Sequence, residues 1–361
     1  MTNFGNMFNG CYSLETLDVS TFNTGKATTL AQTFVNCHGL QEIIGLEKWD
    51  TSKVTSIAST FQLCQSLSNL DGIANWNVSS ITTIGSAFQG MYCLEFLDLS
   101  KWNVISLTDM AQTWRYCYNL KQIKFPKVKT ANLVNMYTAF SDCWSLQSID
   151  LNWLKMDAGT CKTIWCTFSG CRSITELNFP LDWDMSGVAN DNYNFGSTFS
   201  GCWSLKKITG IKDWDVSNVT AKGADNIFQS CWSLTEIDIS GWHLSATSYA
   251  SMFDSCYSLE RIDISNFSFA NCTSTASMFS KCYSLKEIVF PTTINTSNVT
   301  TMASMFADCR SLPSIAQFGI TSWDFTKVTT IASMFANCWS LKSVSLNNLS
   351  LPACTTIATL F

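Results

Sequence analysis

Apolar positions recur along the chain with a period of 25 to 31 residues. Each period contains an aromatic residue, a cysteine three residues later and a leucine or similar residue three residues after that, as in Phe228, Cys231 and Leu234. Thirteen such periods fill nearly all of residues 1–361, with no linker and no shift in composition. Internal repetition of this length is typical of solenoids. The sequence therefore predicts a single solenoid domain over residues 1–361, and neither end resembles a polar capping repeat.

Two local patterns predict the elements of each repeat. The segment Leu-x-x-Leu-x-Leu, seen at Leu234, Ile237 and Ile239, ends in alternating apolar and polar residues, as in a short half-buried strand. After a turn that usually contains Trp, the segment Val299–Phe306 places apolar residues at i, i+3, i+6 and i+7. That spacing predicts one or two helical or 3₁₀ turns. The predicted fold class is an α/β repeat, with short parallel strands on one face and short helical or 3₁₀ turns on the other.

The repeat also resembles a known family. The run Leu94-Glu95-Phe96-Leu97-Asp98-Leu99-Ser100-Lys101-Trp102, together with Ile331-Ala332-Ser333-Met334-Phe335 and Cys338, is similar to the BspA-type leucine-rich repeats of bacterial surface proteins. The resemblance recurs in every period. It implies a right-handed leucine-rich-repeat solenoid, export from the cell and a role in surface adhesion or recognition.

Composition narrows the function. Charged residues make up 14% of the chain and the formal net charge is −5. The sequence therefore contains no basic stripe that could bind the phosphates of a nucleic acid. No apolar run approaches the length of a membrane span, and no signal peptide is visible at the start. The chain has only two His, and it lacks phosphate-loop, HExxH and GxSxG motifs. We therefore expect neither catalysis nor a cofactor.

Most of the 17 cysteines occupy one position of the repeat. Met91 fills that position in the fourth repeat, which keeps an apolar side chain and discards the thiol. Cys161, Cys272 and Cys354 replace the valine that begins the predicted helical turn. These substitutions favour buried, unpaired thiols over disulfides, because stacked positions point their sulfurs the same way. Without a paired CxxC motif, zinc is not expected.

Three features are candidates for ligand contact. Aspartates between the last two apolar strand positions, including Asp238 and Asp263, either recruit a cation or basic partner or bond their own turn. Long periods in the middle of the chain insert residues that include Asp191 and Tyr193, either as a binding loop or as a neutral insertion. An aromatic residue follows the repeated cysteine in four successive repeats, either as an exposed ridge or as a cover over the neighbouring turn. These aromatic residues are Trp203, Trp232, Tyr257 and Tyr283.

The sequence thus predicts a non-enzymatic surface recognition or adhesion module that binds a protein or glycan on a host or neighbouring surface. The alternative is a structural component of a larger assembly, such as a phage tail or a surface layer, which contacts copies of itself or flanking assembly proteins. The first interpretation places the chain outside the cell or at its surface, and the second places it in a virion. Neither involves nucleic acid or insertion into a membrane.

Overall fold

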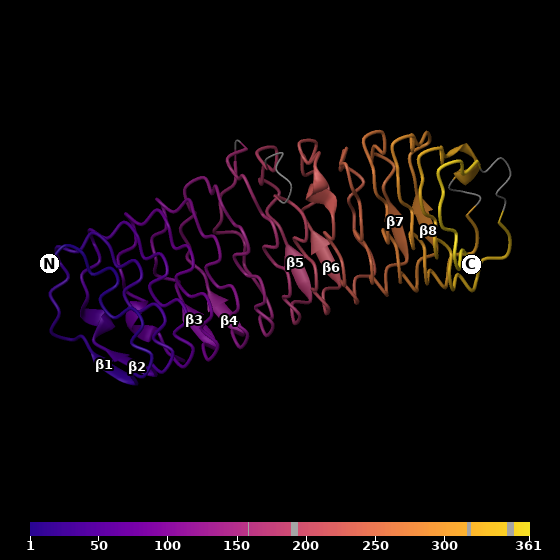
Figure 1. Ribbon diagram of the computed structural model, residues 1–361. Coiled ribbons are helices and arrows are strands. Elements are labelled where there is room, and N and C mark those ends of the chain that lie inside the picture. Colours follow the sequence, from indigo (N-terminus) through magenta and orange to yellow (C-terminus); the bar gives the residue numbers. More distant parts are fainter. Residues whose placement is uncertain (158, 189–193, 316–318, 345–349) are drawn as a thin grey trace. The chain divides into compact units, whose positions relative to one another are not determined.

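The computed structural model describes residues 1–157, 159–188, 194–315, 319–344 and 350–361. Its contacts divide the chain into two compact units, Met1–Ile174 and Thr175–Phe361. Each unit is a stack of coils, one coil per sequence repeat, and short strands lie on one side of the coils (Figure 1). The predicted fold class, a leucine-rich-repeat solenoid, is confirmed. The prediction of a single domain stays a prediction.

The strands pair two by two, in parallel and in register. In the first unit β1 (Thr16–Asp18) pairs with β2 (Glu42–Ile44), and β3 (Phe96–Asp98) pairs with β4 (Gln122–Lys124). In the second unit β5 (Glu176–Asn178) pairs with β6 (Lys207–Thr209), and β7 (Arg261–Asp263) pairs with β8 (Glu287–Val289). The middle residue of each strand points inward and its neighbours point outward, because side chains alternate along a strand.

The strand prediction is wrong for several of the described repeats, among them one that illustrated it. The segment around Ile237, which has the same apolar pattern as β7, forms neither a strand nor a bridge. The sheet is therefore interrupted between β6 and β7, and the coil that contains Ile237 lies in this interruption.

The helical turns predicted for the other face are largely replaced by non-helical turns. In the segment Val299–Phe306, Ser304 has a left-handed φ of 56°, which a continuing α-helix does not allow. The N–H groups of Met302 and Ser304 donate to the next coil, to Thr330 O at 3.1 Å and Ala332 O at 2.9 Å. Of the described 3₁₀ turns, η3 (Lys222–Ala224) is the one in this part of a repeat. The other three follow the strand position: η1 (Leu46–Lys48), η2 (Asp71–Ile73) and η5 (Ile320–Ser322).

The core consists of rows of identical side chains that run from coil to coil. Phe228 stacks on Phe253, and Phe253 stacks on Phe279, each at 5.5 Å between ring centroids. Trp242 lies directly after the turn that follows the strand position, and its indole N–H donates to Ile211 O of the preceding coil at 2.7 Å. Phe228 and Leu234 are fully buried, as predicted. Because each row needs a neighbour on both sides, a lone repeat has no core of its own.

Candidate functional site

The aromatic residues after the repeated cysteine form a stacked row in the second unit, which we call the aromatic ridge. Trp203 lies 4.4 Å from Trp232 between centroids, with the two rings nearly parallel at 4°. Trp232 lies 5.6 Å from Tyr257, which in turn lies 4.8 Å from Tyr283. The structure thus brings these four predicted site residues together. All four are half-buried.

Main-chain hydrogen bonds set the spacing of the aromatic ridge. The serine after each ridge residue donates its N–H to the carbonyl of the ridge residue in the preceding coil. Ser233 reaches Trp203 O at 3.1 Å, Ser258 reaches Trp232 O at 3.2 Å and Ser284 reaches Tyr257 O at 3.1 Å. Each ring is therefore held one coil spacing from the next, which is close to the distance at which aromatic rings stack.

An arginine continues the aromatic ridge at the same position of the next repeat. The guanidinium carbon of Arg310 lies 4.1 Å from the centroid of Tyr283 and 4.4 Å from that of Trp339. Asp308 holds the arginine through an ion pair of 3.2 Å. The flat cation thus replaces a ring in the stack. Sequence reasoning missed this continuation, although the shared position of Arg310 and the aromatic residues could have signalled it.

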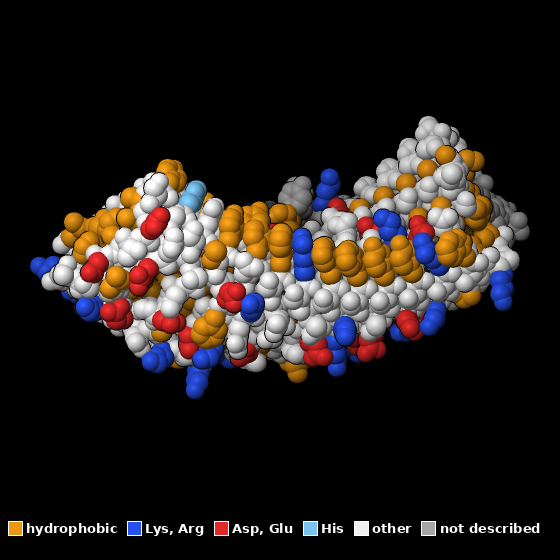
Figure 2. Space-filling model, turned by 90° about the horizontal axis from the view of Figure 1, so that it is seen from below, with side chains coloured by type: hydrophobic (Ala, Val, Ile, Leu, Met, Phe, Trp, Pro, Cys, Tyr) orange, Lys and Arg blue, Asp and Glu red, His pale blue; other side chains and the backbone are white. Residues whose placement is uncertain are grey.

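The first unit carries a similar row at the same repeat position. Tyr92 lies 5.1 Å from Tyr118, Tyr118 lies 4.1 Å from Trp144, and the guanidinium of Arg172 lies 3.9 Å from the Trp144 centroid. Rows of hydrophobic side chains run across the face shown in Figure 2, and Lys or Arg side chains stand in line with them.

Stacking leaves the ring edges, not the ring faces, for contact with a ligand. Trp232 has Trp203 on one side and Tyr257 on the other, so a sugar ring cannot lie flat on it. The rings are at once a cover over the neighbouring coil and a partly exposed surface, so the two interpretations of this position are compatible. The exposed band is apolar and carries the phenol edges of the tyrosines, whereas the indole N–H of Trp232 is buried.

The aspartates of the strand face bond their own turns. Asp238 Oδ1 accepts from the Ser240 N–H at 3.1 Å and from its hydroxyl at 2.7 Å, and Asp263 accepts from the Ser265 N–H at 3.0 Å. The Ser240 hydroxyl is the main reason that the pKa of Asp238 lies below its usual value, and Lys212 at 3.2 Å contributes. These bonds favour a structural role for the aspartates. No group of three or more His, Cys, Asp or Glu side chains suited to a metal ion occurs among the described residues.

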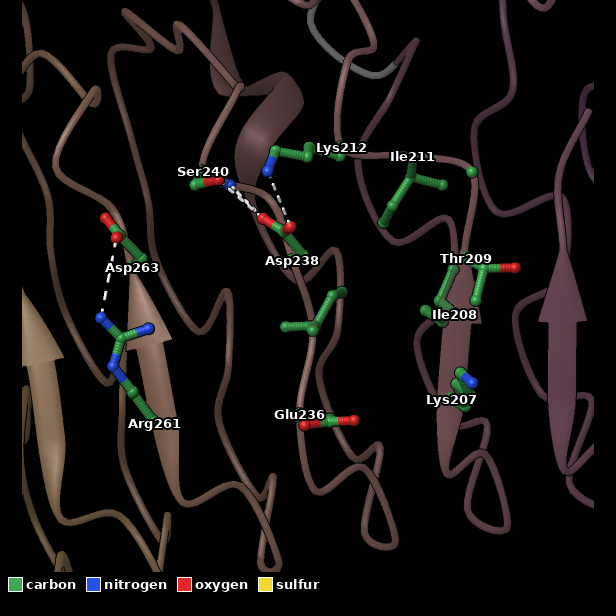
Figure 3. A pocket seen from close by; sticks show the side chains of 12 residues that line it. Lys207, Ile208, Thr209, Ile211, Lys212, Glu236, Asp238, Ser240, Arg261 and Asp263 are labelled. Atoms are coloured by element: carbon green, nitrogen blue, oxygen red, sulfur yellow. Dashed lines mark hydrogen bonds and ion pairs between the residues drawn. The ribbon is translucent and has the colours of Figure 1, made fainter. Parts of the chain in front are cut away.

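The remaining two predicted contact residues, Asp191 and Tyr193, lie outside the described residues. The two predicted aspartates of the strand face, Asp238 and Asp263, line a groove of about 610 Å³, together with residues of β6 (Figure 3). The groove thus unites two predicted residues that the sequence places 25 positions apart.

The repeated cysteine is a packing residue. The thiols of Cys64, Cys117 and Cys256 are free and buried. Each donates to a carbonyl of the preceding coil at 3.0 to 3.1 Å, and the acceptor is the phenylalanine that lies three residues before the position of the repeated cysteine in that coil. Burial raises the pKa of Cys117 to about 12. Met91 fills the same space without exposure, as predicted. Cys354 is only half-buried, contrary to prediction, since it lies in the outermost described coil.

Comparisons with known proteins identify the repeats. A family model described as "Mycoplasma protein of unknown function, DUF285" matches residues 2–123, 41–153, 85–207, 162–289 and 247–361. That description does not name the BspA type. No curated protein sequence matches the chain. The described residues contain no helix long and apolar enough to span a bilayer.

Three solved bacterial structures have a similar fold. A leucine-rich cell surface protein from Faecalibacterium prausnitzii A2-165 is 18% identical, with a TM-score of 0.39 over 80% of this chain and 83% of its own. A leucine-rich-repeat protein from Bacteroides ovatus is 16% identical, with a TM-score of 0.37 over 92% and 87%. Another from Eubacterium ventriosum is 15% identical, with a TM-score of 0.40 over 96% and 84%. These values are too low to carry a functional argument.

Proposed function

Because the chain belongs to the DUF285 family, whose description assigns no function, we propose from its own residues that it is a non-enzymatic recognition module. The module works at a cell surface and binds a protein ligand through the aromatic ridge of the second unit. The observation that carries this proposal is the row of half-exposed stacked rings from Trp203 to Tyr283.

The geometry of the aromatic ridge favours a protein over a glycan. Glycan recognition by aromatic residues uses open ring faces, and the faces of Trp232 and Tyr257 are occupied by neighbouring rings. An apolar band with polar ring edges suits the mixed surface of a protein partner. Rings that are already stacked lose little rotamer freedom on binding, so less affinity is spent on ordering them.

The experiment is an array of host glycans and extracellular-matrix proteins, probed with the full chain and two double variants. Trp232→Ala with Tyr257→Ala removes two central rings, and we expect it to weaken binding to an array protein by at least about tenfold. Trp232→Phe with Tyr257→Phe keeps an aromatic ring at both positions, so we expect it to retain most of the melting temperature and to lose only the affinity that depends on the Tyr257 hydroxyl.

Two results would contradict the proposal. One is an alanine double variant that melts early while its folded fraction binds with unchanged affinity, since the rings would then serve only as a cover. The other is binding confined to glycans, which would contradict the choice of a protein ligand. The matched variant Tyr92→Ala with Tyr118→Ala tests whether the similar row of the first unit contributes.

A further inference from the structure

A second ladder of parallel bridges runs along the first unit, in the segments that were predicted to be helical. The bridges join one residue of each coil to the next: Asn3, Thr29, Ser56, Thr83, Asp109, Asn135 and Thr163. Two positions after the bridge residue, the first five coils carry only Gly or Ala: Gly5, Ala31, Ala58, Gly85 and Ala111. The next two coils carry Tyr137 and Trp165 there instead. The repeat therefore does not need a ring at this position in order to fold.

Tyr137 and Trp165 form a stack that is open at one end. Their centroids lie 5.0 Å apart with the planes at 21°, so the rings lie face to face, because rings placed edge to edge in one plane would collide at this separation. The second face of Tyr137 therefore points toward the preceding coil, where the equivalent residue is Ala111. Gln112 extends away from this face, since its Oε1 accepts from the Ser86 hydroxyl at 3.4 Å. Among the described residues, no other ring and no cation contacts Tyr137.

A carboxylate lies beside the open ring face. Asp109 Oδ1 accepts from the Ala111 N–H at 3.1 Å, and Oδ2 accepts from the Thr83 hydroxyl at 2.9 Å, so the carboxylate is held next to Ala111. Asp109 is half-buried and makes no ion pair among the described residues. Lys162, two coils away, donates to Gly159 O at 3.2 Å. A cation above Ala111 would therefore meet an uncompensated negative charge.

The same chain shows which group fills such a position. Arg310 lies 4.1 Å from the centroid of Tyr283, and Asp308, two residues before it, pairs with its guanidinium at 3.2 Å. The row of the first unit also ends in a guanidinium, 3.9 Å from the last ring. Asp109 precedes Ala111 by the same two residues. The ring and the carboxylate are thus both present at Ala111, but the alanine side chain supplies no cation.

We propose that this position binds an arginine side chain of a partner protein, with the guanidinium flat on Tyr137 and paired with Asp109. Trp165 backs the ring and fixes its orientation. A guanidinium suits the site better than an ammonium, because it is planar, stacks on aromatic faces and pairs with a carboxylate through two N–H groups. The neighbouring outward residues Thr82 and Thr108 are short and uncharged, so a partner surface can approach closely. This site lies in the first unit, apart from the aromatic ridge, and does not depend on the proposed function.

The first test supplies the arginine from the chain itself. Ala111→Arg should place a guanidinium between Asp109 and Tyr137 and raise the melting temperature by about 1–2 °C relative to Ala58→Arg. Ala58→Arg is the matched control, because it lies at the same repeat position without a neighbouring ring or carboxylate. Ala111→Lys should gain less than Ala111→Arg. Adding Asp109→Asn or Tyr137→Leu should remove the gain. Equal melting temperatures for Ala111→Arg and Ala58→Arg would overturn the proposal.

The second test measures binding from outside. A phage-displayed library of linear peptides is selected on the full chain and counter-selected on the double variant Asp109→Asn with Tyr137→Leu. We expect the enriched peptides to share an arginine. Replacing that arginine by lysine or by citrulline, which is planar but uncharged, should weaken binding by about fivefold. Ala111→Arg should block binding, whereas Trp232→Ala with Tyr257→Ala should leave it within about twofold, which separates this site from the aromatic ridge.

Three outcomes would overturn the proposal. One is a selection that yields no peptide specific for the unaltered chain. Another is enrichment of peptides that carry an aromatic residue and no arginine, since Tyr137 would then accept a ring and not a cation. The third is a glycan that binds the full chain and is lost in Tyr137→Leu but not in Asp109→Asn, which would assign the open ring face to a sugar.

Discussion

At the scale of the residue, the cysteine slot shows how one position serves the whole stack. Each ladder thiol fills a small apolar space and donates to a carbonyl of the preceding coil, as Cys117 does to Phe88 O at 3.0 Å. Burial raises the pKa of Cys37 to about 11, so at neutral pH this thiol is almost entirely protonated. Since the thiolate is the reactive form, buried ladder cysteines should be inert in the folded protein.

This argument predicts selective labelling. At pH 8 in the folded state, iodoacetamide should label the exposed Cys93 first and leave Cys64, Cys117 and Cys256 unmodified until denaturant is added. Mass spectrometry of the digested chain measures the order of labelling. Cys93→Ser is the control and should remove the fast phase. Rapid labelling of Cys117 in the folded protein would show that the slot is open to solvent.

At the scale of the element, the phenylalanine row packs each coil against its neighbours. Phe228 touches Phe199 at 5.4 Å, Phe253 at 5.5 Å and Trp242 at 6.1 Å between centroids, and it has no exposed surface. Phe228→Ala should lower the free energy of unfolding by roughly 3–5 kcal/mol. Because a coil contacts only its neighbours, hydrogen exchange should rise mainly in the coils next to Phe228.

The control for that substitution is Leu181→Ala, an apolar truncation in the same unit at a side chain that is 90% exposed. It should change stability by less than about 0.5 kcal/mol. An equal rise of exchange along the whole second unit in Phe228→Ala would contradict the nearest-neighbour picture.

The repeat and its core could be predicted from sequence, because their signal is local and recurs in every coil. Periodicity alone placed Phe228 and Leu234 inside and aligned Trp232 with Tyr257. It could not distinguish the segment around Ile237 from β7, since the two share one pattern and only the hydrogen bonding between coils differs. The spacing of Val299–Phe306 fits a helix or a series of turns equally well. The segment forms turns because its N–H groups donate to carbonyls of the next coil instead of to its own. Local spacing cannot reveal these hydrogen bonds, since they join residues far apart in sequence.

At the scale of the whole molecule, acid sensitivity should follow from a turn that recurs along the chain. In this turn, the side chain of an Asp or Asn accepts a hydrogen bond from the main-chain N–H two residues further on. The turn occurs at the end of the strand position, as at Asp98, and again after the aromatic residue of the turn, as at Asp50. Hydrogen bonds from Ser or Thr lower the pKa of five such aspartates below 3.8: Asp18, Asp50, Asp98, Asp238 and Asp324. Burial raises the pKa of Asp225, which acts in the opposite direction.

Because more of these aspartates have a lowered pKa than a raised one, we predict that the folded protein loses stability in acid. A carboxyl with a lower pKa in the folded state binds protons more readily when unfolded, so its stabilising contribution is present well above pH 4 and is lost as the pH falls through 3.8 and below. The melting temperature should therefore hold from pH 7 to about 5 and drop between about pH 4 and 2.5. Asp50→Asn with Asp324→Asn should make the drop shallower, because Asn77 and Asn295 form the same turn without a titrating group. Scanning calorimetry at fixed ionic strength measures both curves. A melting temperature that stays constant or rises as the pH falls from 5 to 2.5 would mean that these turns do not couple to folding.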